Sequence, residues 1–352
     1  MYIIVAIIAF GILIAVHEAG HFSAAKLLGV RVNEFAIGMG PKLLKKQGKE
    51  TLYTLRALPF GGFCAMEGEN EISADARSFT AQKRWRRIII LAAGGIANLI
   101  VCFIIAIILS SQAKVLVGTT ITELANGFPN EGEHGLMAGD TIISLNGERL
   151  YYIEDFTMFM QLSKSGQVDL VIRRNGEKIA LNNFPLVPRE YMTNGEPVLR
   201  YGLSFNAFEP HAREKLKYSG YMMINFVRLI RVSIAQLING AAGMRDLSGP
   251  VGIVNAMNSV AHNSRSVGEA LSNIVYFMAF IGVNLAIVNL LPIPAMDGGR
   301  ILFIIITWAI EKVIRRRLDP KYEGYIHTTA MVLLMGLMIF VLVNDVAKII
   351  SN

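Results

Sequence analysis

The sequence predicts a polytopic α-helical membrane protein with four transmembrane helices, an inserted β-rich domain and a membrane-associated β-hairpin. Hydrophobic residues make up 53% of the chain and charged residues 17%, whereas a soluble protein has about 25% charged residues. Four apolar stretches reach the roughly 20 residues that a helix needs to cross a bilayer. Between the second and the third stretch, strand-like runs alternate with turn signals.

The four predicted spans cover residues 2–28, 88–109, 271–310 and 328–350. The first has no basic segment in front of it and continues past any cleavage point, so we interpret it as a retained helix and not as a signal peptide. The third is interrupted at Leu291-Pro292-Ile293-Pro294, since proline breaks helical geometry.

Lysines and arginines predict the orientation. The connection from Val30 to Arg87 carries eleven of them, and the loop after the third span also begins with basic residues. Such loops face the cytoplasm. Both termini and the segment 112–270 are then expected on the outer side of the membrane. The net charge is +7, and the basic residues cluster beside apolar runs. This position indicates contact with anionic lipid, so no nucleic-acid partner is expected.

Residues 213–239 predict an amphipathic helix that lies in the membrane interface. On a helical wheel, polar residues including Arg228 and Arg231 share one sector, opposite Met222, Phe226 and Ile230. Two arginines in the middle of a span would be costly, so an interfacial position is favoured over a fifth span.

The outer segment contains a predicted hairpin and a recognisable motif. Strand-like runs flank Asn175-Gly176, a pair typical of two-residue hairpin turns. The stretch from Gly135 to Gly147 resembles one found in PDZ domains. This resemblance implies a small β-sandwich with two helices, and a groove that binds an extended peptide as an added strand.

The cytoplasmic connection predicts a second β-hairpin over residues 34–58, where strand-like runs flank a glycine-containing turn. Pro59, Gly61 and Gly62 are expected to end its regularity. The predicted domains are 1–112 for the first two spans and this hairpin, 113–206 for the PDZ-like domain, 207–270 for the interfacial helix and connector, and 271–352 for the last two spans.

His17-Glu18-Ala19-Gly20-His21 matches the HExxH pattern inside the first span. Residues four apart project from nearly the same face of a helix, so both imidazoles can bind one zinc ion, and the glutamate can act as general base. Ionisable groups within a span are expensive and usually functional. At 1.5 Å per residue, His17 lies roughly 22 Å from the outer end of a core about 30 Å thick, nearer the cytoplasmic side. A set of hydrogen bonds between helices is the alternative.

Zinc catalysis usually needs a third protein ligand. The best candidate is Asp297, the acidic residue that follows the broken part of the third span and stands alone between Glu269 and Glu311. Irregular backbone at membrane depth is tolerated where it lines a cavity. A helix-capping carboxylate is the alternative for Asp297. The two cysteines, Cys64 and Cys102, form no CxxC metal site.

The chain resembles the site-2 protease family of intramembrane zinc metalloproteases (peptidase family M50), and within it the RseP-type bacterial branch with a single PDZ domain. The matching motifs occur in the family's order along nearly the whole chain: HEAGH at 17–21, PFGGF at 59–63, GGIAN at 94–98, the PDZ-like stretch, SGPVGI at 248–253 and NLLPIPAMDGGR at 289–300. Ala19, Gly95 and Met296 depart from residues common in the family, without altering the ligands or the base.

The resemblance implies that His17, His21 and Asp297 bind Zn²⁺, that Glu18 is the catalytic base, and that Asn289 and Pro292 lie near the substrate. It implies hydrolysis of peptide bonds in or near transmembrane segments after the substrate has been trimmed outside. The implied partners are the lipid bilayer and single-span membrane proteins such as anti-sigma factors or signal-peptide remnants.

Three other classes of protein are alternatives to a protease. A membrane scaffold that presents a PDZ domain is the non-enzymatic alternative, and it predicts that Glu18→Gln is harmless. A di-metal oxygenase needs many clustered histidines, whereas this chain has six scattered ones. A transporter is conceivable from the broken span, but paired inverted repeats are not evident.

Overall fold

The structure is a computed structural model that describes residues 2–69, 73–163, 166–193, 196–240, 252, 264, 266–315, 329–341 and 343–344. Two compact units are present, one formed by residues 1–109 and 222–352 and the other by residues 110–221. Most of the motif 248–253 and of the connector 241–265 lies outside the described residues.

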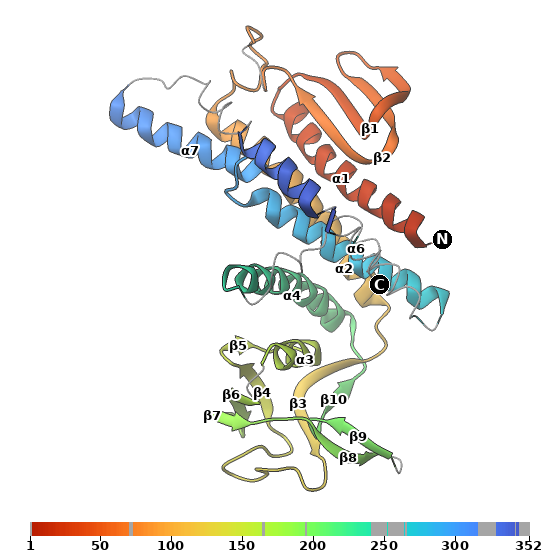
Figure 1. Ribbon diagram of the computed structural model, residues 1–352, viewed down its shortest axis with the longest axis vertical. Coiled ribbons are helices and arrows are strands. Elements are labelled where there is room, and N and C mark those ends of the chain that lie inside the picture. The colour runs from red at the N-terminus through yellow and green to blue at the C-terminus, as the bar shows by residue number, and fades with distance from the viewer. Residues whose placement is uncertain are drawn as a thin grey trace. The chain divides into compact units, whose positions relative to one another are not determined.

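The first unit combines long helices with one β-hairpin (Figure 1). Its elements are α1 (Tyr2–Leu27), β1 (Val32–Gln47), β2 (Leu52–Met66), α2 (Arg84–Ser111), the second half of α4 (Ala212–Ile238), α6 (Val267–Leu290) and α7 (Asp297–Ile314). The hairpin lies alongside α1 (Figure 1). The third predicted span is therefore two helices, and its interruption lies where the prolines predicted it.

A buried cluster joins these elements around the cytoplasmic end predicted for α1. Its members are Ala25, Val30, Val32, Cys64, Met66, Phe79, Ile90, Leu91 and Ile304. Burial of such side chains stabilises each by about 1.5–3 kcal/mol relative to exposure. Because the cluster contains residues of α1, β1, β2, α2 and α7, it fixes the elements that carry the predicted site residues.

The hairpin is longer than predicted. The strands β1 and β2 pair antiparallel, and β2 continues through Pro59 and Gly61 to Met66. Phe35 lies opposite both Tyr53 and Cys64, so the segment around Phe35 pairs with both ends of β2, with shifts of register between the pairs. The glycines that were expected to end the regularity instead allow this shift, since Gly61 adopts a φ of 87° that other residues rarely adopt.

Four described helices are long and apolar enough to cross a membrane, namely Ile7–Leu27 within α1, and α2, α4 and α6. Three of them correspond to predicted spans. The fourth, α4, is the helix predicted to be interfacial, and that position stays a prediction. Part of its apolar face is used for protein packing, because Phe226 is buried against the rings of Tyr276 and Phe280. The predicted span 328–350 is described over 329–341 and 343–344, and Thr329–Val341 forms a shorter apolar helix.

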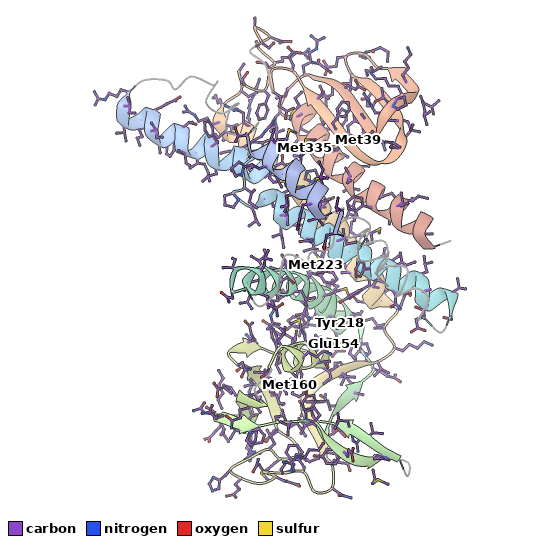
Figure 2. All side chains as sticks on the ribbon, viewed as in Figure 1. Met39, Glu154, Met160, Tyr218, Met223 and Met335 are labelled. Carbon is purple, nitrogen blue, oxygen red and sulfur yellow. The ribbon has the colours of Figure 1, made fainter. Side chains whose placement is uncertain are left out.

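The second unit is built on a β-sheet with strand order β10-β3-β4-β6-β7, where β5 pairs with β4. The elements are β3 (Leu116–Leu124), β4 (Thr141–Leu145), β5 (Glu148–Arg149), α3 (Ile153–Leu162), β6 (Gln167–Arg174), β7 (Glu177–Pro185), β8 (Arg189–Thr193), β9 (Glu196–Arg200), β10 (Leu203–Phe208) and the start of α4. The predicted turn at Asn175-Gly176 is confirmed, because β6 and β7 pair up to Arg174 and Glu177 with both turn residues at positive φ. Glu154 on α3 accepts a hydrogen bond of 3.0 Å from Tyr218 on α4 (Figure 2).

Candidate metal centre

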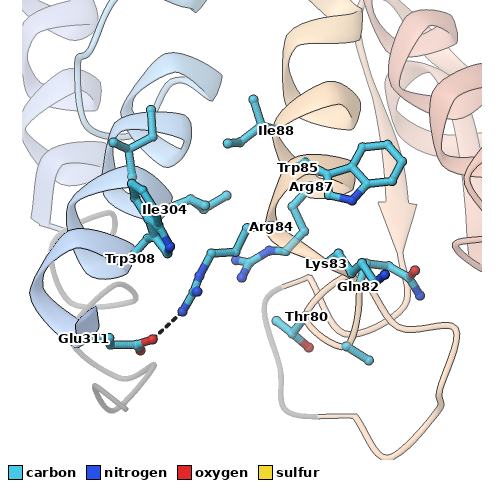
Figure 3. Close-up of a pocket in the computed structure, with 12 residues that line it drawn as sticks. Thr80, Gln82, Lys83, Arg84, Trp85, Arg87, Ile88, Ile304, Trp308 and Glu311 are labelled. Atoms are coloured by element: carbon cyan, nitrogen blue, oxygen red, sulfur yellow. Dashed lines mark hydrogen bonds and ion pairs between the residues drawn. The ribbon is translucent and has the colours of Figure 1, made fainter. Parts of the chain in front are cut away.

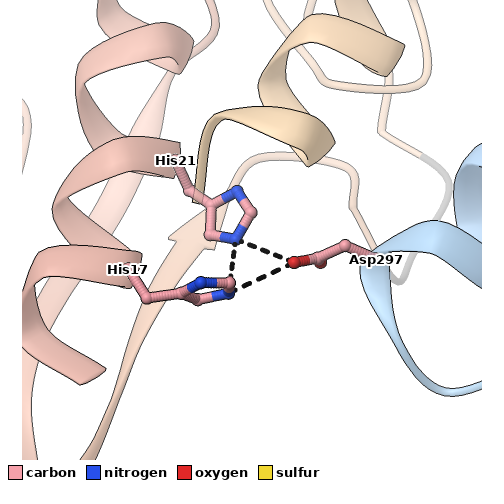
Figure 4. Close-up of side chains that lie close together, drawn as sticks. All are labelled: His17, His21 and Asp297. Carbon is pink, nitrogen blue, oxygen red and sulfur yellow. Dashed lines mark hydrogen bonds and ion pairs between the residues drawn. The ribbon is translucent and has the colours of Figure 1, made fainter. Parts of the chain in front are cut away.

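Three side chains from two distant segments converge inside the first unit (Figure 4). His17 and His21 lie one turn apart on α1, and Asp297 is the first residue of α7. The Nε2 atoms of the two histidines are 3.2 Å apart. The Oδ2 atom of Asp297 lies 3.2 Å from each of them. Three ligand-capable atoms thus form a nearly equilateral triangle.

The triangle has the dimensions of a zinc site. With metal–ligand distances of about 2.0–2.2 Å and tetrahedral angles, neighbouring ligand atoms lie about 3.3–3.6 Å apart, close to the separations observed here. The residues His17 and His21 are 7% and 6% exposed. Two imidazole nitrogens and a carboxylate oxygen are also a donor set that zinc prefers. The residues present therefore fit this metal, with one tetrahedral position left for water or substrate.

Helix α2 positions the histidines from the side. The Nδ1 atom of His21 donates to the carbonyl oxygen of Ile90 at 2.8 Å, which fixes the ring and leaves Nε2 for a metal. Gly94 faces both rings, because a Cβ atom placed there would lie 2.4 Å from Nε2 of His21 and 2.8 Å from Cε1 of His17. Gly20 allows the close approach of the two helices, since its Cβ would lie 2.4 Å from the carbonyl oxygen of Ala93.

The break between α6 and α7 carries the opposite side of the centre. Helix α6 ends at Leu290 and α7 begins at Asp297, with Ala295 in the left-handed region at φ 73°. The N-cap of α7 is Met296, so Asp297 is not the cap residue. The Nδ2 atom of Asn289, in the last turn of α6, lies 3.4 Å from Nε2 of His17. Pro292 is exposed within the break.

Glu18 follows His17 on α1 and faces the hairpin. A Cβ atom placed on Gly62 of β2 would lie 3.4 Å from Cγ of Glu18, so the backbone of β2 passes close to this carboxylate. Cys64, two residues further along β2, is a free and buried thiol. Burial raises the pKa of the Cys64 thiol to about 12, and the Glu18 and Glu69 carboxylates act in the same direction. The thiol is therefore neutral at physiological pH and is a poor metal ligand.

The sequence motifs include Gly94 and Asn98 without predicting a physical role for them, and for Gly62 they predict only the end of the hairpin. The structure brings Gly94 against the histidines and Gly62 against Glu18. Asn98, one helical turn after Gly94, is fully buried, and neither of its amide atoms has a hydrogen-bond partner among the residues that the structure describes. A glycine-rich run in an apolar helix was the available signal, because such runs permit close helix packing.

Comparisons with known proteins agree on one family. Residues 5–337 match peptidase family M50. A Clostridium acetobutylicum protein named "Putative zinc metalloprotease" is 35% identical over 345 residues, which cover 98% of this chain and 97% of that protein. A Clostridium perfringens protein of the same name is also 35% identical, with 98% of each chain covered. The Bacillus subtilis protein "Regulator of sigma-W protease RasP" is 26% identical, with 99% of this chain and 98% of that protein covered.

The family match spans nearly the whole chain, and its description agrees with the resemblance found in the sequence motifs. Several apolar helices of spanning length accompany it, as expected for a multi-pass membrane protein. The chain therefore belongs to peptidase family M50, the site-2 proteases, and is a zinc metalloprotease of that type.

Proposed function

We propose that His17, His21 and Asp297 hold the catalytic zinc and that Glu18 is the general base of an intramembrane peptide hydrolysis. The observation that carries this proposal is the position of Oδ2 of Asp297, 3.2 Å from Nε2 of both histidines. Three lone-pair donors so close together repel one another unless a cation or a proton lies between them. Hydrogen bonds alone, the alternative for these groups, would leave the match to zinc dimensions unexplained.

A zinc ion held by His17, His21 and Asp297 would polarise a peptide carbonyl and acidify a water molecule. Glu18 takes a proton from the attacking water as the water oxygen bonds to the carbonyl carbon. The same carboxyl group then delivers the proton to the departing amide nitrogen, so the C–N bond breaks into a carboxylate and an amine. Asn289 supplies an amide donor beside His17, 3.4 Å from its Nε2 atom, and stabilises the oxyanion.

The substrate is a peptide segment in an extended form. A transmembrane helix hides its carbonyls in backbone hydrogen bonds and must unwind locally before cleavage. The hairpin supplies a strand beside Glu18, and an extended segment pairs with it by strand addition. Membrane association of the hairpin is supported by its exposed apolar side chains, which include Met39, Leu43, Leu44, Leu55 and Leu58. Pro292 lies in the irregular break beside the same segment.

The partners in this proposal are single-span membrane proteins trimmed on the outer side, such as anti-sigma factors and signal-peptide remnants. The name of the RasP relative, a regulator of sigma-W, supports this class of substrate. The β-rich unit acts as a PDZ-like domain on the outer side with both termini, and either binds peptides or excludes untrimmed proteins. The domain boundaries at 112, 206 and 270, the interfacial position of α4 and the cytoplasmic placement of the metal belong to the same proposal.

Zinc analysis and cleavage assays of the purified full-length chain test the proposal. Glu18→Gln is expected to keep about one zinc per chain and to cleave a single-span substrate at least 10²–10⁴-fold more slowly. His17→Ala is expected to lose the metal. Glu177→Gln, at an exposed position on β7, is the matched control and keeps both properties. Cleavage at the wild-type rate by Glu18→Gln would refute the catalytic role of this residue, and no cleavage by the zinc-loaded wild type would favour the scaffold alternative.

A further inference from the structure

A cavity lies in the first unit, between the N-terminal end of α2 and the C-terminal half of α7 (Figure 3). It has a volume of about 870 Å³, within the range of small-molecule sites. We call it the α2–α7 cavity. Its polar and aromatic lining includes Lys83, Arg84, Trp85, Arg87, Trp308 and Glu311. None of these residues belongs to the proposed metal centre.

The charge of the α2–α7 cavity favours an anion. Among the described lining residues, three carry cationic side chains, Lys83, Arg84 and Arg87, and one, Glu311, carries a carboxylate. Arg84 forms an ion pair with Glu311 (Figure 3). The described lining therefore has more cationic than anionic side chains. Lys83 is exposed, so its ammonium group can approach a ligand without unpacking the core.

The other walls are those of a lipid site. Trp85 and Trp308 are 51% and 48% exposed. Tryptophan is enriched where a membrane meets water, because its ring is amphipathic. Ile88, Ile304 and Ile305 line the apolar part of the cavity, and Ile305 is 46% exposed. A free phosphate would use the cationic rim and leave this apolar wall uncovered.

The position of the cavity along the helices agrees with this chemistry. Helix α2 is a candidate membrane span that begins at Arg84, so the cavity lies at the level where a span meets the lipid headgroups. Basic pockets between helices at this level bind anionic headgroups. We propose that the α2–α7 cavity binds an anionic phospholipid, with its phosphate against Lys83 and Arg87 and its acyl chains along Ile88, Ile304 and Ile305.

Occupation of the cavity would hold α7 against α2. These two helices carry Asp297 and Gly94, which meet at the metal centre. Trp308 lies eleven residues after Asp297, roughly 16 Å along the helix axis. The lipid is therefore a structural ligand that braces the helix supplying Asp297, distinct from any substrate.

Native mass spectrometry of the full-length chain tests the proposal, after incubation with equal amounts of phosphatidylglycerol and phosphatidylcholine. The wild type is expected to retain the anionic lipid at least tenfold more often. Lys83→Gln combined with Arg87→Gln should reduce this preference about 10- to 30-fold, since each cation near the surface contributes a several-fold gain. Arg173→Gln combined with Lys178→Gln removes the same charge from exposed positions on β6 and β7 and should keep the preference.

Glu311→Gln separates the proposal from a folding defect, because this change should strengthen the binding of anionic lipid by removing the competing carboxylate. Inorganic phosphate is added in a further arm and should not displace the lipid. The proposal is overturned if the Lys83 and Arg87 variant keeps the preference, if the control loses it equally, or if phosphate competes fully. The last result would indicate a site for a free anion.

Discussion

Two carboxylates, one in each unit, have opposite surroundings. Asp140 in the second unit is 1% exposed and accepts hydrogen bonds of 2.7 and 2.8 Å from the Arg174 guanidinium and of 2.8 Å from the Met137 amide. Asp297 in the first unit meets the Nε2 atoms of His17 and His21. The protein supplies the positive charge that Asp140 needs, whereas the partners of Asp297 are nitrogen atoms that can themselves bind a metal ion. A carboxylate satisfied by arginine is structural, and one surrounded by imidazoles favours a cation.

The largest expected difference comes from the same substitution at both carboxylates. Asp297→Asn removes an anionic ligand, so we expect zinc content to fall well below one per chain and cleavage to stop, with little loss of folding. Asp140→Asn leaves the Arg174 guanidinium poorly paired. We expect it to cost about 3–5 kcal/mol of stability and to leave zinc bound. Zinc analysis and thermal unfolding of both variants measure the contrast.

Either of two outcomes would contradict this contrast between the two carboxylates. Full zinc stoichiometry in Asp297→Asn would remove Asp297 from the ligands, and loss of zinc in Asp140→Asn would show that the second unit controls the metal centre.

The next prediction tests whether the metal centre requires the absence of a side chain at position 94. Gly94→Ala introduces a Cβ atom 2.4 Å from Nε2 of His21, so at least one ring must move. Misplacement of a catalytic group by about 1 Å costs on the order of a hundredfold in rate, and we expect that loss with weakened zinc binding. Gly220→Ala on α4 is the matched control, because nothing lies within 4 Å of its added Cβ atom. It should leave cleavage unchanged and stabilise the helix by up to about 1 kcal/mol.

Two glycines of the metal centre, Gly94 and Gly62, show which features could not be predicted from the sequence. The spacing of His17 and His21 is local and follows from helix geometry alone, so it could be predicted. Asp297 could be predicted as a candidate because a carboxylate stands out in an apolar region. The role of Gly94 depends on which helix packs against α2, and a single sequence does not contain that information. The same holds for Gly62, whose importance arises from the approach of β2 to Glu18.

The fold could be predicted to a similar extent. Apolar length identified α1, α2 and α6, and the prolines identified the break before α7. The hairpin was placed correctly but ended too early, because a register shift at Gly61 lets β2 continue. The wheel of α4 revealed its apolar face but not the use of Phe226, since packing against Tyr276 and Phe280 is a tertiary property. Identification of the second unit as a PDZ domain stays a prediction.

The prediction for Asn289 concerns stabilisation of the substrate during the reaction and not binding of the metal. Its Nδ2 atom lies 3.4 Å from Nε2 of His17 and has the reach to donate to a developing oxyanion. Asn289→Leu is expected to lower kcat about 10²–10³-fold, with zinc content unchanged, as for loss of one oxyanion donor. Asn273→Leu on the same helix breaks the hydrogen bond to Ser264 and should keep kcat. An unchanged kcat in Asn289→Leu would show that the amide has no such role.

The smallest expected effect concerns buried polar groups that are not ligands. Asp155 in the second unit is fully buried and accepts hydrogen bonds from the amides of Tyr151 and Tyr152. Asn98 in the first unit is equally buried, yet neither amide atom has a partner among the described residues. An unsatisfied buried group costs about 1–3 kcal/mol, and leucine has the same number of side-chain atoms as asparagine or aspartate.

We therefore expect Asn98→Leu to raise the Tm by about 2–6 °C and Asp155→Leu to lower it, as measured by thermal unfolding of the full chain. The opposite result for Asn98 would mean that its amide is satisfied in the working enzyme. Helical side chains lean toward the N-terminus of their helix, so the amide of Asn98 leans over Gly94, where the ring of His17 lies. The buried Nδ1 atom of His17 is likewise without a partner among the described residues. A lower Tm accompanied by weaker zinc binding would thus assign Asn98 to the support of His17, in the way that Ile90 supports His21.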